Sequence, residues 1–337
     1  MCMVNKVKIG NKVVGDDEPV FIVAEIGLNH CGDLKIALES VKVAAESGAD
    51  AVKFQIFKAD ELYSKKDKYY KLFKALELPR EAWEKIANFA EKQNILFAAS
   101  VFDEESVDLL SELDAPFFKI ASGDITHIPL IKYIARKNKP VILSTGMSTI
   151  GEIEEALNAI YSEGNRDVIL LHCVSRYPAN YSELNLRAIN TLKNTFKVPV
   201  GFSDHTIGIL ASLAAVALGA NVIEKHFTIN KNLPGPDHKL SLEPHEFKEL
   251  VKGIRNIEEM LGDGVKRKTK SELHMEKVAR RSIVARIDIP KGTVISKDML
   301  KISRPGIGIA PKFLNMIIGR VARKDIRKDE VIRWEFI

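Results

Sequence analysis

Residues 200–228 read VGFSDHTIGILASLAAVALGANVIEKHFT, and this stretch decides the fold. Two short β-rich runs, Val200–Ser203 and Val222–His226, flank the apolar helical pattern Ile207–Leu218. Strand, helix and a second buried strand make one βα step of a parallel sheet. We therefore expect His205 and His226, which are 21 residues apart, at the carboxyl ends of neighbouring parallel strands.

The same alternation runs through most of the chain, after a predicted hairpin at roughly Val7–Val14. The eight predicted strands are Val20–Glu25, Ala51–Ile56, Leu96–Ser100, Phe117–Ile120, Val141–Ser144, Val168–His172, Val200–Ser203 and Val222–His226. The eight predicted helices are Leu34–Ser47, Arg80–Lys92, Glu104–Ser111, Ile128–Arg136, Ile150–Ser162, Leu186–Thr195, Ile207–Leu218 and Pro244–Leu261. This count predicts an α/β fold, a (β/α)₈ TIM barrel over residues 1–262. An open doubly wound sheet is the alternative, but the Gly-rich turn expected after its first strand is missing.

The C-terminal part of the sequence has a different texture. Residues 263–280 are polar and charged, which predicts a linker, and residues 281–337 predict a small β-rich domain. Within that domain Val284–Ile295 matches Val321–Ile332 at an offset of 37 residues. Each copy is expected to form two short strands around a Lys-containing turn, so the domain should be pseudo-symmetric.

Composition narrows the class of protein. The chain has 337 residues, 46% hydrophobic and 28% charged, and a net charge of +5, without basic runs interleaved with aromatics. We expect neither a nucleic-acid nor a membrane partner. The N-terminus lacks the apolar core of a signal peptide, so a cytoplasmic protein is predicted. Cys2, Cys31 and Cys173 lack metal-finger spacing, and Cys31 and Cys173 are interpreted as packing residues without a base partner.

The active site of a (β/α)₈ barrel lies at the carboxyl ends of its strands. Facing imidazoles of His205 and His226 there would provide a two-nitrogen clamp for a divalent metal. The alternative is that each histidine is a hydrogen-bonded residue of the core. His30 and His172 are interpreted as hydrogen-bonding rather than metal-binding.

A second group of residues predicts an anion site. Lys53 and Lys119 are expected to point inward from two strands, near the turn Ser144-Thr145-Gly146. Hydroxyls, backbone N–H groups and ammonium groups together bind phosphate oxygens. The alternative is that each lysine pairs with a neighbouring carboxylate. Glu25 and Asp237 are candidates for acid–base groups or acceptors of sugar hydroxyls. A metal beside an anion site suggests carbon–carbon bond chemistry, in which a phosphorylated nucleophile attacks a polarised carbonyl.

The ordered motifs resemble those of the sialic acid synthases (N-acetylneuraminate synthases). The strings are EIGLNH (25–30), VKFQ (52–55), FKIASGD (118–124), LSTGM (143–147), GFSDHT (201–206), EKHFT (224–228) and PGPD (234–237). The tail, with SRPG at 303–306, resembles the antifreeze-like (SAF) domain of that family.

This resemblance implies condensation of phosphoenolpyruvate with an open-chain N-acetylated amino sugar, usually N-acetylmannosamine, to give sialic acid and phosphate. His205 and His226 would hold the metal, typically Mn²⁺, with Mg²⁺ or Co²⁺ as alternatives. Glu25 and Asp237 would orient the sugar. The residues implied for the phosphate and carboxylate are Lys53, Ser100, Lys119, Ser122, Ser144, Gly146 and Tyr177. Asp124 stands where family members often have Glu, which puts a proton-transfer role at Asp124 in doubt.

The resemblance leaves several alternatives open. The acceptor could be a 2,4-diacetamido sugar, giving legionaminic or pseudaminic acid, or a phosphorylated amino sugar. A non-catalytic barrel that only binds a sugar is an alternative of another class. The family also implies a domain-swapped homodimer, in which Arg304 of each tail completes the site of the other subunit.

Overall fold

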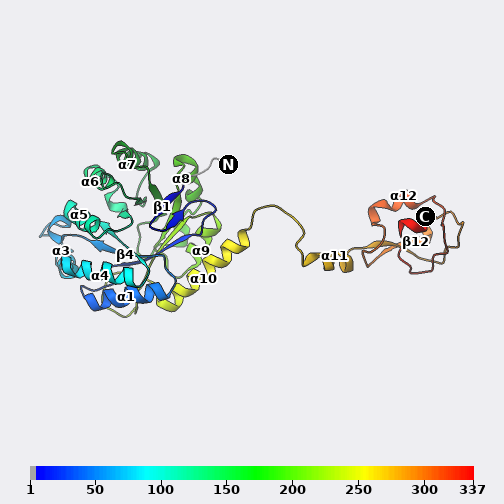
Figure 1. Ribbon diagram of the computed structural model, residues 1–337, viewed down its shortest axis with the longest axis horizontal. Helices are drawn as coiled ribbons and strands as arrows, with labels where there is room; N and C mark the ends of the chain where they lie inside the picture. Colours follow the sequence, from blue (N-terminus) through cyan, green and yellow to red (C-terminus); the bar gives the residue numbers. More distant parts are fainter. Residues whose placement is uncertain (1–4) are drawn as a thin grey trace. The chain divides into compact units, whose positions relative to one another are not determined.

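The computed structural model describes residues 5–337, so Cys2 lies outside the described residues. Eight parallel strands form a closed barrel in which chain neighbours pair and β10 closes on β3 (Figure 1). The strands are β3 Phe21–Gly27, β4 Ala51–Ile56, β5 Leu96–Val101, β6 Phe118–Ile120, β7 Val141–Ser144, β8 Val168–Cys173, β9 Val200–Asp204 and β10 Val222–His226. The predicted TIM barrel is therefore confirmed.

A main helix follows each strand and covers the outside of the barrel (Figure 1). These helices are α1 Leu34–Glu46, α4 Arg80–Lys92, α5 Glu104–Glu112, α6 Ile128–Ala135, α7 Ile150–Ser162, α8 Ala188–Phe196, α9 Leu210–Ala217 and α10 Pro244–Leu261. Helix α9 begins three residues later than predicted, because Gly208 has a φ of 78° and the chain turns there before the helix starts.

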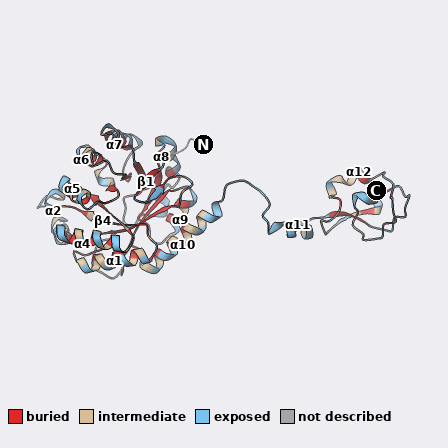
Figure 2. Cartoon of the chain, in the orientation of Figure 1, coloured by how far each residue is buried: buried red, intermediate tan, exposed pale blue. Residues whose placement is uncertain are grey.

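Apolar side chains fill both sides of the barrel wall. The strands of the barrel are accordingly mostly buried (Figure 2). Outward residues such as Ile22 and Phe54 pack under the helices. Inward residues such as Phe21 and Phe117 fill the amino-terminal end of the barrel together with the hairpin β1 Val7–Ile9 and β2 Lys12–Val14. Since that end is packed, the space inside the barrel opens at the carboxyl ends of the strands.

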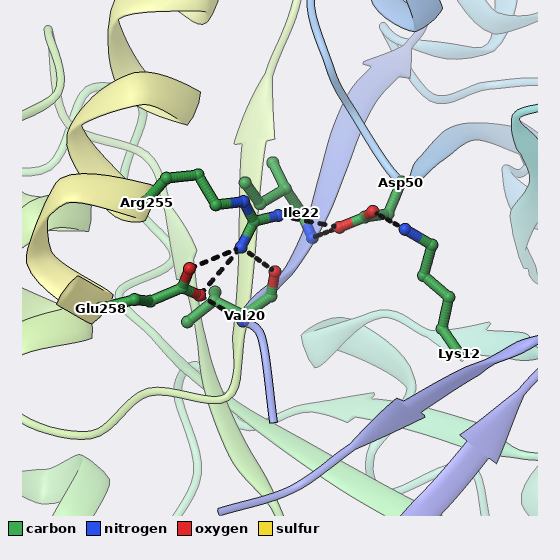
Figure 3. A network of polar contacts seen from close by, with 6 residues as sticks. All are labelled: Lys12, Val20, Ile22, Asp50, Arg255 and Glu258. Carbon is green, nitrogen blue, oxygen red and sulfur yellow. Dashed lines mark hydrogen bonds and ion pairs between the residues drawn. The ribbon is translucent and has the colours of Figure 1, made fainter. Parts of the chain in front are cut away.

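A polar network at the packed end ties four elements together (Figure 3). The Asp50 carboxylate, just before β4, accepts a hydrogen bond of 2.8 Å from the backbone N–H of Ile22 and pairs with Lys12 of the hairpin. Arg255 of α10 lies 3.6 Å from Asp50 and donates to the Val20 carbonyl at 3.1 Å. The network fixes where the barrel closes.

Three short helices were not predicted from the sequence. Helices α2 Ala59–Leu62 and α3 Tyr70–Leu76 form an insertion between β4 and α4. Within the predicted linker 263–280, helix α11 spans Glu272–Ala279, and its eight residues are too polar to stand out as a periodic pattern.

The chain divides into two compact units, residues 1–262 and 263–337. The second unit contains the antiparallel pair β11 Ser282–Ala285 and β12 Leu300–Ser303 and the short helix α12 Leu314–Ile317. Its own core comprises eleven buried apolar residues, including Ile283, Ile289 and Ile326. The two repeat copies contribute mostly isolated bridges rather than the full strands expected.

Those bridges show how the two copies are related. Ile289 pairs with Ile326, its own equivalent at the 37-residue offset, through reciprocal backbone hydrogen bonds of 2.8 and 2.9 Å. Asp288 and Asp325, also equivalent, each accept a 2.7 Å hydrogen bond from the lysine turn of the opposite copy. Such reciprocity is that of a two-fold axis through the Ile289–Ile326 pair, as the repeat predicts.

No helix in residues 5–337 combines the length and apolar character needed to cross a membrane.

Candidate active site

A cavity of about 450 Å³ opens at the carboxyl ends of the barrel strands. Ten residues predicted from the sequence line it: Glu25, Lys53, Ser100, Lys119, Ser122, Ser144, Tyr177, His205, His226 and Asp237. The fold therefore brings together side chains from six strands and from the loops that follow four strands, and the distances between them define what the cavity can do.

The two histidines face one another inside this cavity. Their ring centroids are 5.6 Å apart, and the Tyr177 ring lies 4.2 Å from that of His205. Nδ1 of His205 lies 2.8 Å from the carbonyl oxygen of Val174, so Nδ1 carries the proton and Nε2 keeps a free lone pair. Burial lowers the pKa of both imidazoles, and for His226 the neighbouring His205 and Lys53 lower it further.

Neutral imidazoles with free lone pairs are suitable metal ligands. Nδ1 of His226 is buried and has no hydrogen-bond partner among the described residues, a costly state unless a ligand fills it. A divalent metal therefore fits this pair. No cluster of three or more His, Cys, Asp or Glu in residues 5–337 could hold a metal, so remaining coordination positions would go to water or substrate.

Lys53 is held by two carboxylates. Its Nζ lies 2.6 Å from Glu25 Oε2 and 3.7 Å from Glu224 Oε2, and it donates to Ser100 Oγ at 3.0 Å. The alternative reading of this lysine, a carboxylate pair, is thus observed. Burial raises the pKa of Glu25 to about 7, against the opposing effect of Lys53. Glu25 is therefore poised to gain or lose a proton near neutral pH.

Lys119 differs, because its ammonium contacts neutral groups. Nζ donates to Ser144 Oγ at 2.6 Å and to the carbonyl oxygen of Ile120 at 3.0 Å. None of the ion pairs among the described residues includes Lys119. Burial lowers its pKa. The ionised Glu224 acts on Lys119 from beyond ion-pair distance, and no carboxylate contacts this buried ammonium directly, so it is suited to bind an anion from outside the chain.

Glu224 was not assigned a role from the sequence. Burial raises the pKa of this carboxyl, but Lys119 and Lys53 together outweigh burial and hold it well below its usual range. Ser203 Oγ donates to Glu224 Oε1 at 2.7 Å and lies 3.5 Å from Nε2 of His205. The ionised Glu224 thus links the lysine side of the cavity to the histidine side. The two-residue strand period places Glu224 on the same face as His226, a pattern that could have identified it.

The turn after β7 shapes one wall. The backbone N–H of Gly146 donates to Ser122 Oγ at 3.0 Å, and a Cβ added at Gly146 would lie only 2.2 Å from Ser175 Oγ. Gly146 therefore acts by leaving room rather than by lining the cavity. Asp124 lies in the short turn Ser122–Asp124 and is not among the lining residues. Burial raises its pKa.

An apolar wall, which the sequence did not predict, comes from the insertion between β4 and α4. We call Tyr63, Tyr69, Leu72 and Phe73 the aromatic wall, and all four line the cavity. The rings of Tyr63 and Phe73 are 4.7 Å apart, and Phe73 packs on Phe57 at 5.2 Å. Tyr69 and Leu72 are 46% and 41% exposed, more than large apolar side chains usually are.

Asp237 enters the cavity from the loop between β10 and α10. Burial raises its pKa from the ordinary value of 3.8 to about 6. Its backbone carbonyl accepts a 2.6 Å hydrogen bond from Ser241 Oγ, and Ser241 Oγ accepts one of 2.9 Å from Asn29 Nδ2. The turn after β3 thus supports this loop.

Other predictions meet a mixed outcome. His172 and His30 do form hydrogen bonds, to the Leu184 carbonyl at 2.6 Å and from the Gly32 N–H at 3.1 Å. The interpretation of Cys31 was wrong, because its Sγ lies 3.2 Å from Nε2 of His238. The partner is 207 residues away in the sequence, and proximity at that separation arises only from closure of the barrel. Arg304 is exposed on the second unit.

Comparison with known proteins places these observations in a family context. The NeuB family model matches residues 40–266, and the SAF domain model matches residues 280–337. N,N'-diacetyllegionaminic acid synthase of Campylobacter jejuni is 48% identical over 93% of this chain and 98% of its own length. N-acetylneuraminate-9-phosphate synthase of Homo sapiens is 36% identical over 96% of this chain and 94% of its own. Among solved structures, N-acetylneuraminic acid synthetase of Leptospira borgpetersenii matches with a TM-score of 0.77 and 40% identity, over 81% of this chain and 95% of that one.

Proposed function

The chain belongs to the NeuB family, and from that premise we propose that it is an enzyme joining phosphoenolpyruvate to an open-chain N-acetylated amino sugar. A bond forms between C3 of phosphoenolpyruvate and the aldehyde carbon, water adds at C2, and phosphate leaves. The products are a nine-carbon sugar acid and inorganic phosphate.

The observation that carries the proposal is the division of one cavity into two chemically different sides. On one side Lys119 presents an ammonium that contacts no carboxylate directly, beside Ser144. On the other side the neutral imidazoles of His205 and His226 face each other. A phosphorylated anion fits the first side and a carbonyl oxygen the second.

Each group has a proposed task. Lys119, Lys53, Ser100, Ser122, Ser144 and Tyr177 would hold the phosphate and carboxylate of phosphoenolpyruvate. Glu25, whose pKa burial raises to about 7, would accept a proton from the water that adds at C2. Asp237 would accept a hydrogen bond from a hydroxyl or amide of the sugar and so orient its aldehyde. Asp124 is given no contact with substrate here, because it does not line the cavity.

His205 and His226 would hold a divalent ion, which we propose to be Mn²⁺, with Mg²⁺ and Co²⁺ as alternatives. When bound, such an ion polarises the aldehyde carbonyl and stabilises the negative charge that develops on its oxygen. The hydrogen bond from His205 Nδ1 to the Val174 carbonyl fixes the ring orientation that this task needs.

The acceptor is the finer question. N-acetylmannosamine, expected from the sequence, carries four hydroxyls beyond its acetamido group, whereas a 2,4-diacetamido-trideoxy sugar carries a second acetamido group and a methyl. The aromatic wall lines one side of the cavity with apolar groups and favours the second class. Lys53 and Lys119 are the only cations that line the cavity within the described barrel, which argues against a phosphorylated acceptor.

A phosphate-release assay tests the proposal. Purified full-length protein with Mn²⁺ should release phosphate from phosphoenolpyruvate only when an N-acetylated amino sugar is present, and mass spectrometry should find the condensed product. Release without any sugar would indicate a phosphatase. No release with any amino sugar or metal would leave the non-catalytic, sugar-binding barrel as the better description.

A further inference from the structure

A thiol–imidazole contact lies just outside the cavity and is not used by the proposed reaction. Cys31 Sγ, in the turn after β3, lies 3.2 Å from Nε2 of His238 and 3.2 Å from the carbonyl oxygen of Pro234. Both partners belong to the loop that carries Asp237. His238 itself is buried, and Cys31 is partly exposed.

Both nitrogens of the His238 ring have a contact partner. Thr228 Oγ1 lies 2.8 Å from Nδ1, and Cys31 Sγ lies 3.2 Å from Nε2. The ring is therefore held from two sides, by Thr228 just after β10 and by Cys31 after β3.

The Cys31 thiol stays protonated. Burial raises the pKa of Cys31, and the nearby Asp33 raises it further. A neutral S–H can be shared between Nε2 of His238 and the Pro234 carbonyl, so a single side chain holds the loop at two points. The ring also fills the space beside Gly235, where an added Cβ would lie 2.8 Å from it.

In the sequence, Asp237 lies between Pro234 and His238, the two residues that Cys31 contacts, and a further hydrogen bond holds Asp237 itself. Its backbone carbonyl is held by Ser241, whose hydroxyl accepts from Asn29, two residues before Cys31. Residues 234–236 are exposed, so the loop has few other contacts that would keep it in place.

We propose that Cys31 is a positioning residue that, through His238, holds the loop 229–241 so that the Asp237 carboxylate faces the acceptor side of the cavity. This inference rests on the proposed function, since that function assigns Asp237 to the acceptor. Cys31 touches no substrate in this scheme. Its loss should therefore affect recognition of the amino sugar and leave phosphoenolpyruvate binding intact.

The kinetic test compares Cys31→Ala with Cys31→Ser, which keeps a donor. Cys31→Ala should raise KM for the amino sugar by about tenfold, because a misplaced loop misplaces its carboxylate. KM for phosphoenolpyruvate should change less than about twofold, and Cys31→Ser should restore most of the loss. Asn232→Ala, at an exposed position of the same loop, is the matched control and should behave like the parent chain.

A double-mutant cycle asks whether Cys31 acts through Asp237. In an Asp237→Asn chain the Cys31→Ala change should add little, because the side chain it positions has already lost its charge. Full additivity, or an equal rise in both KM values, would overturn the proposal.

Hydrogen–deuterium exchange supplies a readout that needs no turnover. Cys31→Ala should speed exchange in the peptide spanning 229–241 and leave the barrel strands unchanged. Unchanged exchange in that peptide would refute the positioning role even if the chain proved to catalyse another reaction. A chain that lacks activity but shows the local exchange change would refute the proposed function alone.

Discussion

His205 and His226 lie opposite each other on adjacent strands, with ring centroids 5.6 Å apart. Their alignment follows from the register of β9 and β10, in which Asp204 pairs with Lys225. Asp204 and Lys225 form a fully buried ion pair of 3.0 Å behind the histidines, and Lys225 also donates to the Thr206 carbonyl at 2.6 Å. The pair thus fixes both histidines from the outer side of the barrel.

Removing either histidine should abolish metal-dependent activity. We expect His205→Ala and His226→Ala each to lower kcat at least about a hundredfold, and a chelator to abolish activity until Mn²⁺, Co²⁺ or Mg²⁺ is restored. His172→Ala is the matched control, because that histidine bonds the Leu184 carbonyl and does not line the cavity. Full turnover in excess chelator would exclude a metal role for the pair.

Loss of Lys119 should weaken the binding of only one of the two substrates. Lys119→Ala should weaken phosphoenolpyruvate binding by about 10- to 100-fold and leave amino-sugar binding nearly unchanged, because its ammonium contacts no protein carboxylate directly. Lys58→Ala, which removes a surface partner of Glu105, provides the control. An equal loss for both ligands would make Lys119 a structural residue.

Lys53→Ala should in addition lower the melting temperature. Lys53 lies between Glu25 and Glu224, and breaking a buried pair of this kind typically costs about 3–5 kcal/mol because the remaining charges are left uncompensated. A melting temperature equal to that of Lys119→Ala would show that the two carboxylates do not depend on Lys53.

Asp237 should give the reaction an acidic limb near pH 6. Burial raises the pKa of Asp237 to about 6, so this carboxyl is ionised above that pH and loses its charge below it. We expect kcat/KM for the amino sugar to fall as the pH drops through 6, and Asp237→Asn to lower the plateau and remove this limb. The acidic limb of the pH profile that we assign to Glu25, whose pKa is about 7, should persist in the Asp237→Asn variant. A pH profile unchanged by Asp237→Asn would contradict the assignment.

The aromatic wall should select the acceptor. Leu72→Asn adds polarity at an exposed position, so it should leave the fold intact while it lowers kcat/KM for a 2,4-diacetamido-trideoxy acceptor by about 10-fold relative to N-acetylmannosamine. Ala75→Asn, exposed on the same helix and outside the cavity, controls for helix propensity. A parent chain that prefers N-acetylmannosamine would refute the selective role of the wall.

The strands could be predicted because each is a local property of the sequence. Buried parallel strands such as Val141–Ser144 read as mainly apolar runs, and the active site of a barrel lies where such strands end, so Ser144 could be placed there without further information. Helix α7 is also a local property of the sequence, because Thr149 and Glu152 form a capping box at its start.

Contacts between distant segments could not be predicted. The partner of Cys31 is His238, and the distance between them depends on how two loops fold over the barrel. The aromatic wall could not be predicted for another reason. Helices α2 and α3 are only four and seven residues long, and hydrophobic periodicity is recognised only over a longer window. The strand alternation puts Glu224 on the same face as His226. Its role could not be predicted, because it depends on Lys53 and Lys119, which lie on other strands.

The two units of the chain also carry opposite charges. Residues 263–337 contain 19 of the 50 Lys and Arg but only 9 of the 45 Asp and Glu, so the tail is strongly basic and residues 1–262 are net acidic. The family resemblance implies a domain-swapped homodimer, in which Arg304 would bind the sugar in the other subunit's site, and we predict this arrangement rather than one in which Arg304 serves its own barrel.

Mixing two inactive variants decides between the arrangements. Arg304→Ala chains keep their histidines, and His205→Ala chains keep their arginine. In a swapped heterodimer one site carries both lesions and the other carries neither, so random exchange of subunits should restore about a quarter of the parent activity. If Arg304 serves its own barrel, every site keeps one lesion and mixing restores nothing. Full activity of Arg304→Ala alone would remove Arg304 from the site altogether, and a monomer by sedimentation at the assay concentration would exclude the swap.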